Sequence, residues 1–220
     1  MKIVLLPGLD GTGDLFEPIL NQFPKYIDVA IIRYNNNKKQ TYKELIEYVA
    51  NQLPKDDFIL VAESFSGYIA YEIGLKRFKN LKQIVFVATF LTNPRPIILN
   101  LIPSFIFRLH IPKFIIKWLF LGFNANNNII NLFQKTISNI PPEVIWFRLQ
   151  EIKKLNPTNN RLNLPTTYIL ATQDCLVPKS SLRDFQKLCQ NLKIYPIEGK
   201  HLILQSKPKD CAKIINSLNA

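Results

Sequence analysis

The chain has 220 residues, which is enough for one domain with a large core but short for two. Its composition, 47% apolar and 20% charged, is typical of a soluble globular protein. Three cysteines do not suggest a disulfide framework and favour a cytoplasmic location, while two histidines argue against a histidine-based metal site. The net charge of +12 would suit nucleic acid, an anionic membrane or an acidic protein, but genome composition explains the lysines equally well.

Two kinds of targeting segment are not expected. The first residues form an apolar run that is too short for a signal peptide, and a glycine-rich turn follows at once. The most apolar stretch, residues 97–123, is interrupted by prolines and basic residues, so it contains no uncharged run of the length that a membrane span needs.

Six short β-rich segments alternate with helical patterns. Each is a nearly continuous apolar run, as in parallel strands covered on both faces, and they lie at residues 2–6, 28–33, 58–62, 83–88, 166–171 and 193–197. Helices are predicted at residues 14–22, 41–52, 66–77, 180–191 and 208–218. Thr41 and Glu44 form a capping box at the start of the second helix. This alternation predicts an α/β fold with a mostly parallel six-stranded sheet and helices on both faces.

The connection between the fourth and fifth strands is far longer than the others. It contains no convincing strand, and its helical patterns lie at residues 97–107, 113–121, 129–138 and 142–154. A structureless loop of this length is implausible in a compact domain, so a helical insertion is predicted. The expected organisation is a core of residues 1–90 and 166–220 with a helical cap at residues 91–165.

A serine stands where the third strand turns into a helix, in the sequence A-E-S-F-S-G. A nucleophile elbow needs small residues two positions before and after the serine, and Ala62 and Ser66 meet this need around Ser64. Ser66 is the less suitable nucleophile because bulky Tyr68 lies two positions after it. Taken alone, the segment is equally compatible with a serine that caps the following helix.

Two later strand ends supply partners for this serine. His201 follows the last predicted strand, whereas His110 lies among apolar and basic residues of the cap, where a packing or surface role is favoured. Asp174 follows the fifth strand. The order Ser64, Asp174, His201 is that of serine hydrolases built on such an elbow, and ligands bind at the carboxyl ends of parallel strands. His201 would be the general base, and Asp174 would orient its imidazole.

The oxyanion of an acyl-transfer reaction needs backbone N–H donors. One is predicted at Phe65, at the start of the helix after the elbow. The other is predicted at Leu9, in the loop P-G-L-D-G-T-G, whose glycines let the backbone approach a ligand closely. This loop matches neither G-x-G-x-x-G nor G-x-x-x-x-G-K, although a plain turn also fits it.

With these segments the sequence resembles the α/β-hydrolase superfamily over nearly its whole length. It is most similar to small bacterial carboxylesterases with an L-P-G-L-D-G-T-G loop and an A-E-S-F-S-G elbow. The resemblance implies the fold, a helical cap in the insertion, and a triad and two oxyanion donors at Ser64, Asp174, His201, Leu9 and Phe65. The chain departs from the pattern at Pro7, often a histidine, at Ala62 and Ser66, often glycines, and in lacking the usual first strands.

The predicted activity is that of a serine hydrolase that cleaves a small carboxylic ester or thioester through an acyl-enzyme, without cofactor or metal. The alternatives are other chemistry on the same triad and a non-catalytic receptor that keeps the pocket. Glu63 is predicted to form a hydrogen-bonding wall of the site, with tuning of His201 as the alternative.

Positive charge is concentrated in the cap. Residues 91–165 contain nine basic and two acidic residues, so they carry +7 of the net +12. A positive cap would steer an acidic acyl-carrier protein toward the site, and the candidate contacts are Arg108, Lys113, Arg148 and Lys153. Docking on an anionic membrane through aromatic residues such as Phe105, Phe114 and Trp118 is an alternative, as is simple solvated charge. Nucleic acid is not expected as a partner.

Overall fold

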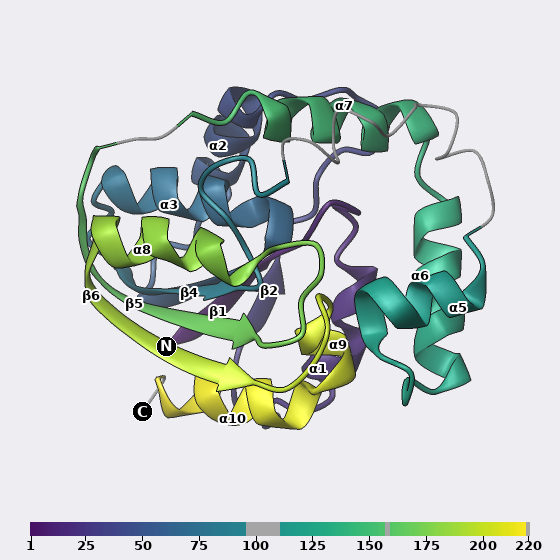
Figure 1. Cartoon of the computed structure of the whole chain (residues 1–220). Coiled ribbons are helices and arrows are strands. Elements are labelled where there is room, and N and C mark those ends of the chain that lie inside the picture. The colour runs from purple at the N-terminus through teal and green to yellow at the C-terminus, as the bar shows by residue number, and fades with distance from the viewer. Residues whose placement is uncertain (96–110, 157–158, 219–220) are drawn as a thin grey trace.

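The structure is a computed structural model that describes residues 1–95, 111–156 and 159–218. Its strands form one sheet in the order β2-β1-β3-β4-β5-β6, and every neighbouring pair is parallel (Figure 1). The strands are β1 (Lys2–Leu6), β2 (Val29–Ile31), β3 (Phe58–Glu63), β4 (Leu81–Val87), β5 (Leu162–Ala171) and β6 (Cys189–Ile197). The predicted six-stranded parallel sheet is therefore confirmed, and it is wholly parallel.

Two strands, β5 and β6, begin four residues earlier than the sequence pattern predicts, and β4 begins two residues early. The added residues of β5 and β6 lie where these strands pair with each other and, within the described ranges, with no third strand, since β4 meets β5 from Thr166 onward. Many of these added residues are exposed. An extension outside the covered part of the sheet lacks the continuous apolar run by which the buried strands are recognised.

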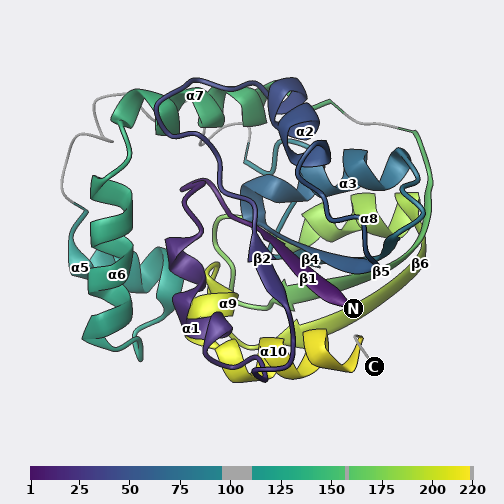
Figure 2. The same ribbon diagram turned by 180° about the vertical axis from the view of Figure 1, so that it is seen from behind.

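Helices cover both faces of the sheet (Figure 1), and Figure 2 shows the same layers from behind. One face is covered by α2 (Tyr42–Ala50), α3 (Gly67–Leu75) and α8 (Leu182–Leu188). The other is covered by α1 (Glu17–Leu20), α9 (Ile203–Ser206) and α10 (Pro208–Ser217). A hydrophobic core lies on each face of the sheet, and alternate residues of β1 point into one or the other. Val4 and Leu6 pack on the face of α2, α3 and α8, and Ile3 and Leu5 pack on the face of α1, α9 and α10.

The predicted helices are present with small differences. The capping box of α2 is formed as expected: the Thr41 hydroxyl accepts from the N–H of Glu44, and the Glu44 carboxylate accepts from the N–H of Thr41 at 2.7 Å. The first predicted helix is split into a 3-10 turn (Asp14–Phe16) and α1. The single-turn helix α9 was not predicted, because four residues are too few for a helical period to show.

The insertion between β4 and β5 is helical where it is described. It contains α5 (Lys113–Ile116), a π-helical turn (Lys117–Leu121), α6 (Asn127–Ser138) and α7 (Pro142–Lys153). The predicted helix at 97–107, together with Phe105, Arg108 and His110, lies outside the described residues. We call residues 111–156 the helical insertion. Its helices α5 and α6 lie beyond the carboxyl ends of β5 and β6, and α7 lies next to α2 (Figure 1). No helix in the described ranges is both long enough and apolar enough to cross a membrane.

Candidate active site

Ser64 lies at the turn between β3 and α3 with a positive φ of 50°. This left-handed conformation is uncommon for a residue with a Cβ, and it is kept only where the surroundings enforce it. The Thr89 hydroxyl donates to the carbonyl oxygen of Ser64, and a Cβ on Gly67 would overlap this hydroxyl. The turn is therefore fixed in the sharp form that a nucleophile elbow requires.

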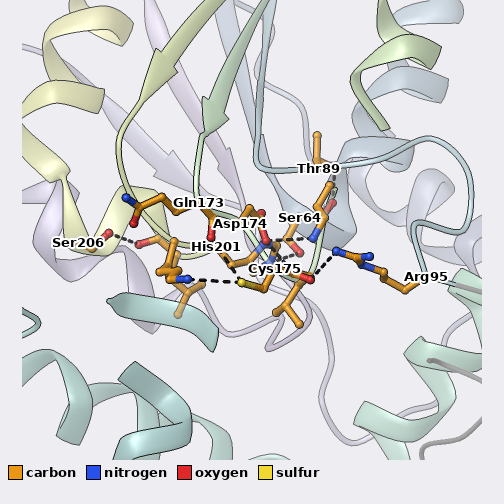
Figure 3. A network of polar contacts seen from close by, with 12 residues as sticks. Ser64, Thr89, Arg95, Gln173, Asp174, Cys175, His201 and Ser206 are labelled. Carbon is orange, nitrogen blue, oxygen red and sulfur yellow. Dashed lines mark hydrogen bonds and ion pairs between the residues drawn. The ribbon is translucent and has the colours of Figure 1, made fainter. Parts of the chain in front are cut away.

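Three predicted residues form one hydrogen-bonded chain (Figure 3). The Oγ of Ser64 lies 2.8 Å from Nε2 of His201, and Nδ1 of His201 lies 2.7 Å from Oδ2 of Asp174. The other carboxylate oxygen of Asp174 accepts from the N–H groups of Leu176 and Val177 at 2.8 and 3.0 Å. Each member follows the carboxyl end of a strand, and the backbone donors fix the carboxylate that orients the imidazole.

The second serine of the elbow is turned away from this chain. Ser66 is fully buried, its hydroxyl donates to the carbonyl oxygen of Pro7, and it is hydrogen-bonded to the hydroxyl of Tyr34. Ser66 therefore ties the elbow to the loop after β1, in agreement with the choice of Ser64 as the candidate nucleophile.

Leu9 and Phe65, the predicted oxyanion donors, both line the same cavity as Ser64. The carbonyl oxygen of Gly8 accepts from the N–H of Gly11 at 3.1 Å, so the N–H of Leu9, on the opposite edge of that peptide, points away from the turn. By the same argument, the bond from Thr89 to the Ser64 carbonyl directs the N–H of Phe65 away from Thr89. We retain both N–H groups as candidate oxyanion donors.

Arg148 of α7 is one of the most deeply buried side chains, with 1% of its surface exposed. Its Nη1 donates to the carbonyl oxygens of Leu9 and Asp10 at 2.9 and 3.0 Å, and its Nη2 donates to Oδ1 of Asn36 at 2.8 Å. A Cβ on Gly11 would lie 2.6 Å from Nη1. The prediction that Arg148 contacts a carrier protein is wrong, because its guanidinium is enclosed and fixes the loop that carries Leu9.

The other cap bases differ in their surroundings. Lys113 of α5 is exposed. Lys153 of α7 is half-buried, and its ammonium lies 5.1 Å from the ring centre of Trp146. Arg108 lies outside the described residues. Among the four predicted contacts, Lys113 and Lys153 are thus the ones that the structure leaves near the surface of the insertion.

A cavity of about 220 Å³ opens at Ser64 and His201. Its wall is mostly apolar, and the insertion contributes Ile111, Phe120, Phe133, Ile137, Ile145 and Leu149. Such a cavity suits the acyl part of an ester. A larger hollow of about 750 Å³ lies around the end of α3 and the start of β5, and its wall contains none of the hydrogen-bonded chain.

Glu63 is 1% exposed and is not part of the cavity wall, so the prediction that it forms a wall of the site is wrong. Its Oε2 accepts from Nε2 of Gln205 at 3.1 Å, and within the described part of the chain its buried Oε1 has no hydrogen-bond partner. Burial raises the pKa of Glu63 to about 8, against a smaller lowering by His201. Burial lowers the pKa of His201, but the Asp174 carboxylate and then Glu63 raise it, with a net rise.

The buried Glu63 carboxyl leads to a prediction about stability and pH. In the folded protein the Glu63 carboxyl has a pKa of about 8 and so keeps its proton until the pH approaches that value. In the unfolded chain it releases the proton near its usual pKa of 4.5. Because the folded state binds more protons in this window, its stability falls as the pH rises through it. Glu63→Gln has no proton to lose, so we expect it to raise Tm relative to the unmodified protein above the window and much less below it.

Thermal unfolding measured on both sides of this window tests the expectation. Glu47→Gln, at an exposed position of α2, is the matched control and should change Tm little. A Tm difference for Glu63→Gln that is the same at both pH values would mean that the folded state does not hold the proton.

Comparison with known proteins gives one partial relative. No known protein-family profile matches the chain. A pimeloyl-[acyl-carrier protein] methyl ester esterase from Pseudoalteromonas atlantica is 31% identical over 96 residues. The match covers 40% of this chain and spans only 37% of the relative's length.

Solved structures match nearly the whole chain. A lipase-esterase related protein from Clostridium acetobutylicum has a TM-score of 0.82 and 17% identity, covering 98% of this chain and 93% of its own. An extracellular alpha/beta-hydrolase from a Paenibacillus species has a TM-score of 0.68 and 18% identity, covering 99% and 98%. The chain therefore has the α/β-hydrolase fold, as the sequence predicts.

Proposed function

We propose that the protein is a serine hydrolase that cleaves a carboxylic ester or thioester through an acyl-enzyme on Ser64. The observation that carries the proposal is the hydrogen-bonded chain of Ser64, His201 and Asp174 at the end of an apolar cavity. The partial relative, named as an esterase, supports the same reaction class.

The reaction follows from the geometry. As the Oγ of Ser64 attacks the ester carbonyl, Nε2 of His201 takes its proton, and Asp174 stabilises the resulting imidazolium through Nδ1. The N–H groups of Leu9 and Phe65 would stabilise the oxyanion. His201 then returns the proton to the departing alcohol or thiol. In the second half, His201 takes a proton from water as the water attacks the acyl-enzyme carbonyl, and it returns that proton to the Oγ of Ser64 as the acid leaves.

Short p-nitrophenyl esters test this reaction directly. A hydrolase should turn them over with the release of one acid per nitrophenol, and the apolar cavity should give a preference for acyl chains that fill it. A non-catalytic receptor would bind the same esters without turnover, and that result would contradict the proposal.

A finer part of the proposal concerns the natural substrate, which we propose is an acyl ester linked to an acidic carrier protein in the cytoplasm. Three observations support it: the name of the partial relative, the concentration of positive charge in residues 91–165, and the exposed Lys113. The three cysteines are unpaired, which supports a reducing compartment. Phe114 and Trp118 are 67% and 52% exposed beside Lys113, which favours an anionic membrane as the second candidate.

Charge reversal on the insertion separates these partners. We expect Lys113→Glu and Lys153→Glu each to lower kcat/KM for a carrier-linked ester by about 3- to 10-fold at low salt and to leave a small soluble ester unchanged. The loss should shrink as the salt concentration rises. Lys209→Glu, at an exposed position on α10 outside the insertion, is the matched control.

The alternative explanations of the positive charge predict different results in this experiment. Equal losses with both substrates would mean that these lysines support the fold or the pocket, and the carrier would be abandoned. Loss of binding to anionic lipid vesicles with no change toward the carrier-linked ester would identify the membrane instead.

A further inference from the structure

Arg95 is a cation in the wall of the cavity that contains Ser64 and His201. It lies shortly after β4 and is half-buried. Its Nη2 donates to the carbonyl oxygen of Cys175 at 2.9 Å, next to the triad member Asp174 (Figure 3). Its Nε is buried and has no hydrogen-bond partner among the residues that the structure describes. Among the described residues, no carboxylate lies within ion-pair distance of Arg95.

Arg148 is a useful comparison for Arg95, because its guanidinium has a structural role in the same region. Arg148 donates to three acceptors through Nη1 and Nη2 and is enclosed by the loop after β1. Arg95 has the same five N–H donors but uses them for one backbone acceptor. A guanidinium in a mostly apolar wall is costly unless an acceptor or a counter-ion meets it.

Asp10 is the one acidic residue in the described part of the cavity wall, and its carboxylate is already engaged. Its Oδ2 accepts from the N–H and hydroxyl of Thr12 at 2.9 and 2.6 Å and from the N–H of Gly13 at 3.2 Å. The described wall therefore supplies no counter-ion for Arg95, and a ligand in the cavity would supply one.

Resting on the hydrolase proposed above, we propose that Arg95 binds an anionic group of the substrate, a carboxylate or a phosphate. The planar guanidinium offers paired N–H donors, which match the two oxygens of either group in a bidentate arrangement. The substrate is then an ester or thioester that carries a negative charge within reach of the cavity, with its apolar part against the insertion. Arg95 is in this view a specificity-determining residue of the cavity.

Two matched pairs of substrates locate the charge. The first pair is the mono-p-nitrophenyl ester of a six-carbon dicarboxylic acid, with a free carboxylate, and its neutral ω-methyl ester. The second is a hexanoyl thioester of phosphopantetheine and the same thioester of pantetheine, which differ only in the phosphate. The unmodified protein should prefer the charged member of at least one pair.

Arg95→Gln removes the charge but keeps a neutral N–H donor for the Cys175 carbonyl. We expect it to lower kcat/KM for the preferred charged substrate by about 10- to 100-fold and to leave its neutral counterpart within about twofold. Arg95→Lys should lower kcat/KM for this substrate less than Arg95→Gln does, because lysine keeps the positive charge, although it lacks the paired N–H donors of the guanidinium. Arg161→Gln, an exposed arginine in the hollow at the other end of the sheet, is the control and should change neither.

The results distinguish this inference from the function on which it rests. Loss confined to the dicarboxylic pair identifies a carboxylate, and loss confined to the pantetheine pair identifies a phosphate. Turnover without a charge preference, or equal losses for charged and neutral members in Arg95→Gln, would overturn the inference and leave Arg95 as a tether of the Cys175 loop. No turnover of any ester or thioester would overturn the hydrolase, and the inference with it.

Discussion

Ser64→Ala is expected to abolish labelling by a fluorophosphonate probe and to lower ester turnover by about four to six orders of magnitude. The Oγ of Ser64 is the hydroxyl that lies 2.8 Å from Nε2 of His201, so its removal takes away the attacking atom. The residual rate would come from the oxyanion donors and from substrate binding. Labelling followed by mass-spectrometric mapping of the modified residue measures the first effect, and steady-state kinetics measures the second.

Ser66→Ala is the matched control for this substitution. It removes the hydroxyl that contacts Pro7 and Tyr34, so it is expected to lower Tm while Ser64 is still labelled. Labelling that persists in Ser64→Ala, or that disappears in folded Ser66→Ala, would contradict the assignment of the nucleophile.

The members of the hydrogen-bonded chain could be predicted because each follows a strand that contains a short, nearly continuous apolar run in the sequence. β5 and β6 end in the apolar residues Ala171 and Ile197, and β3 ends in Glu63 directly before Ser64. The polar residues that follow the three strands stand at the edge of a parallel sheet where ligands bind. The small residues at positions 62 and 66 then select Ser64 from the two serines, in line with the buried contacts of Ser66. Periodicity and local sterics were sufficient here, because both are visible in short segments of sequence.

The residues that fix the oxyanion loop could not be predicted, because their contacts join distant parts of the chain. Arg148 reaches the carbonyls of Leu9 and Asp10, which lie more than a hundred residues earlier, and it was interpreted as a surface charge. Thr89 contacts the elbow across 25 residues, and no local pattern marks it. A sequence shows that an arginine is present, but burial and acceptors decide whether it faces a partner or the protein.

The net charge of residues 91–165 likewise does not show which of the basic side chains face a partner. The excess in residues 91–165 is real, yet Arg148 contributes to it from the interior, and Lys153 lies against an aromatic ring.

Glu63 shows the same limit. Its position beside Ser64 predicts a wall of the site, whereas its side chain is buried and accepts a hydrogen bond from Gln205. Local sequence places the backbone of such residues, and the packing of α9 decides where the side chain lies.

His201→Ala is expected to cost about as much activity as Ser64→Ala, and the double substitution should cost little more, because the members of a triad act as a unit. A hydroxyl without its base at 2.8 Å stays protonated at neutral pH and is a poor nucleophile. Kinetics of the two single variants and the double variant measure this. Losses that add independently in the double variant would contradict a shared mechanism.

Asp174→Asn tests the acid of the chain, and we expect it to lower kcat by about three to four orders of magnitude. The N–H groups of Leu176 and Val177 need an acceptor, so the amide oxygen is expected to stay with them and the amide NH2 to face Nδ1 of His201. Nδ1 would then be the unprotonated nitrogen, and Nε2 would carry the proton and be unable to accept one from Ser64.

The pH profile distinguishes this loss of orientation from general damage to the fold. In the unmodified protein kcat/KM should rise with pH through a single group, the imidazole of His201, because only its neutral form accepts the proton of Ser64. Burial lowers the pKa of His201, but the charge and hydrogen bond of Asp174 raise it above the usual value. Asp174→Asn removes both, so the midpoint of the residual activity should move to lower pH. A variant that kept near-normal kcat and an unchanged midpoint would show that another carboxylate orients His201.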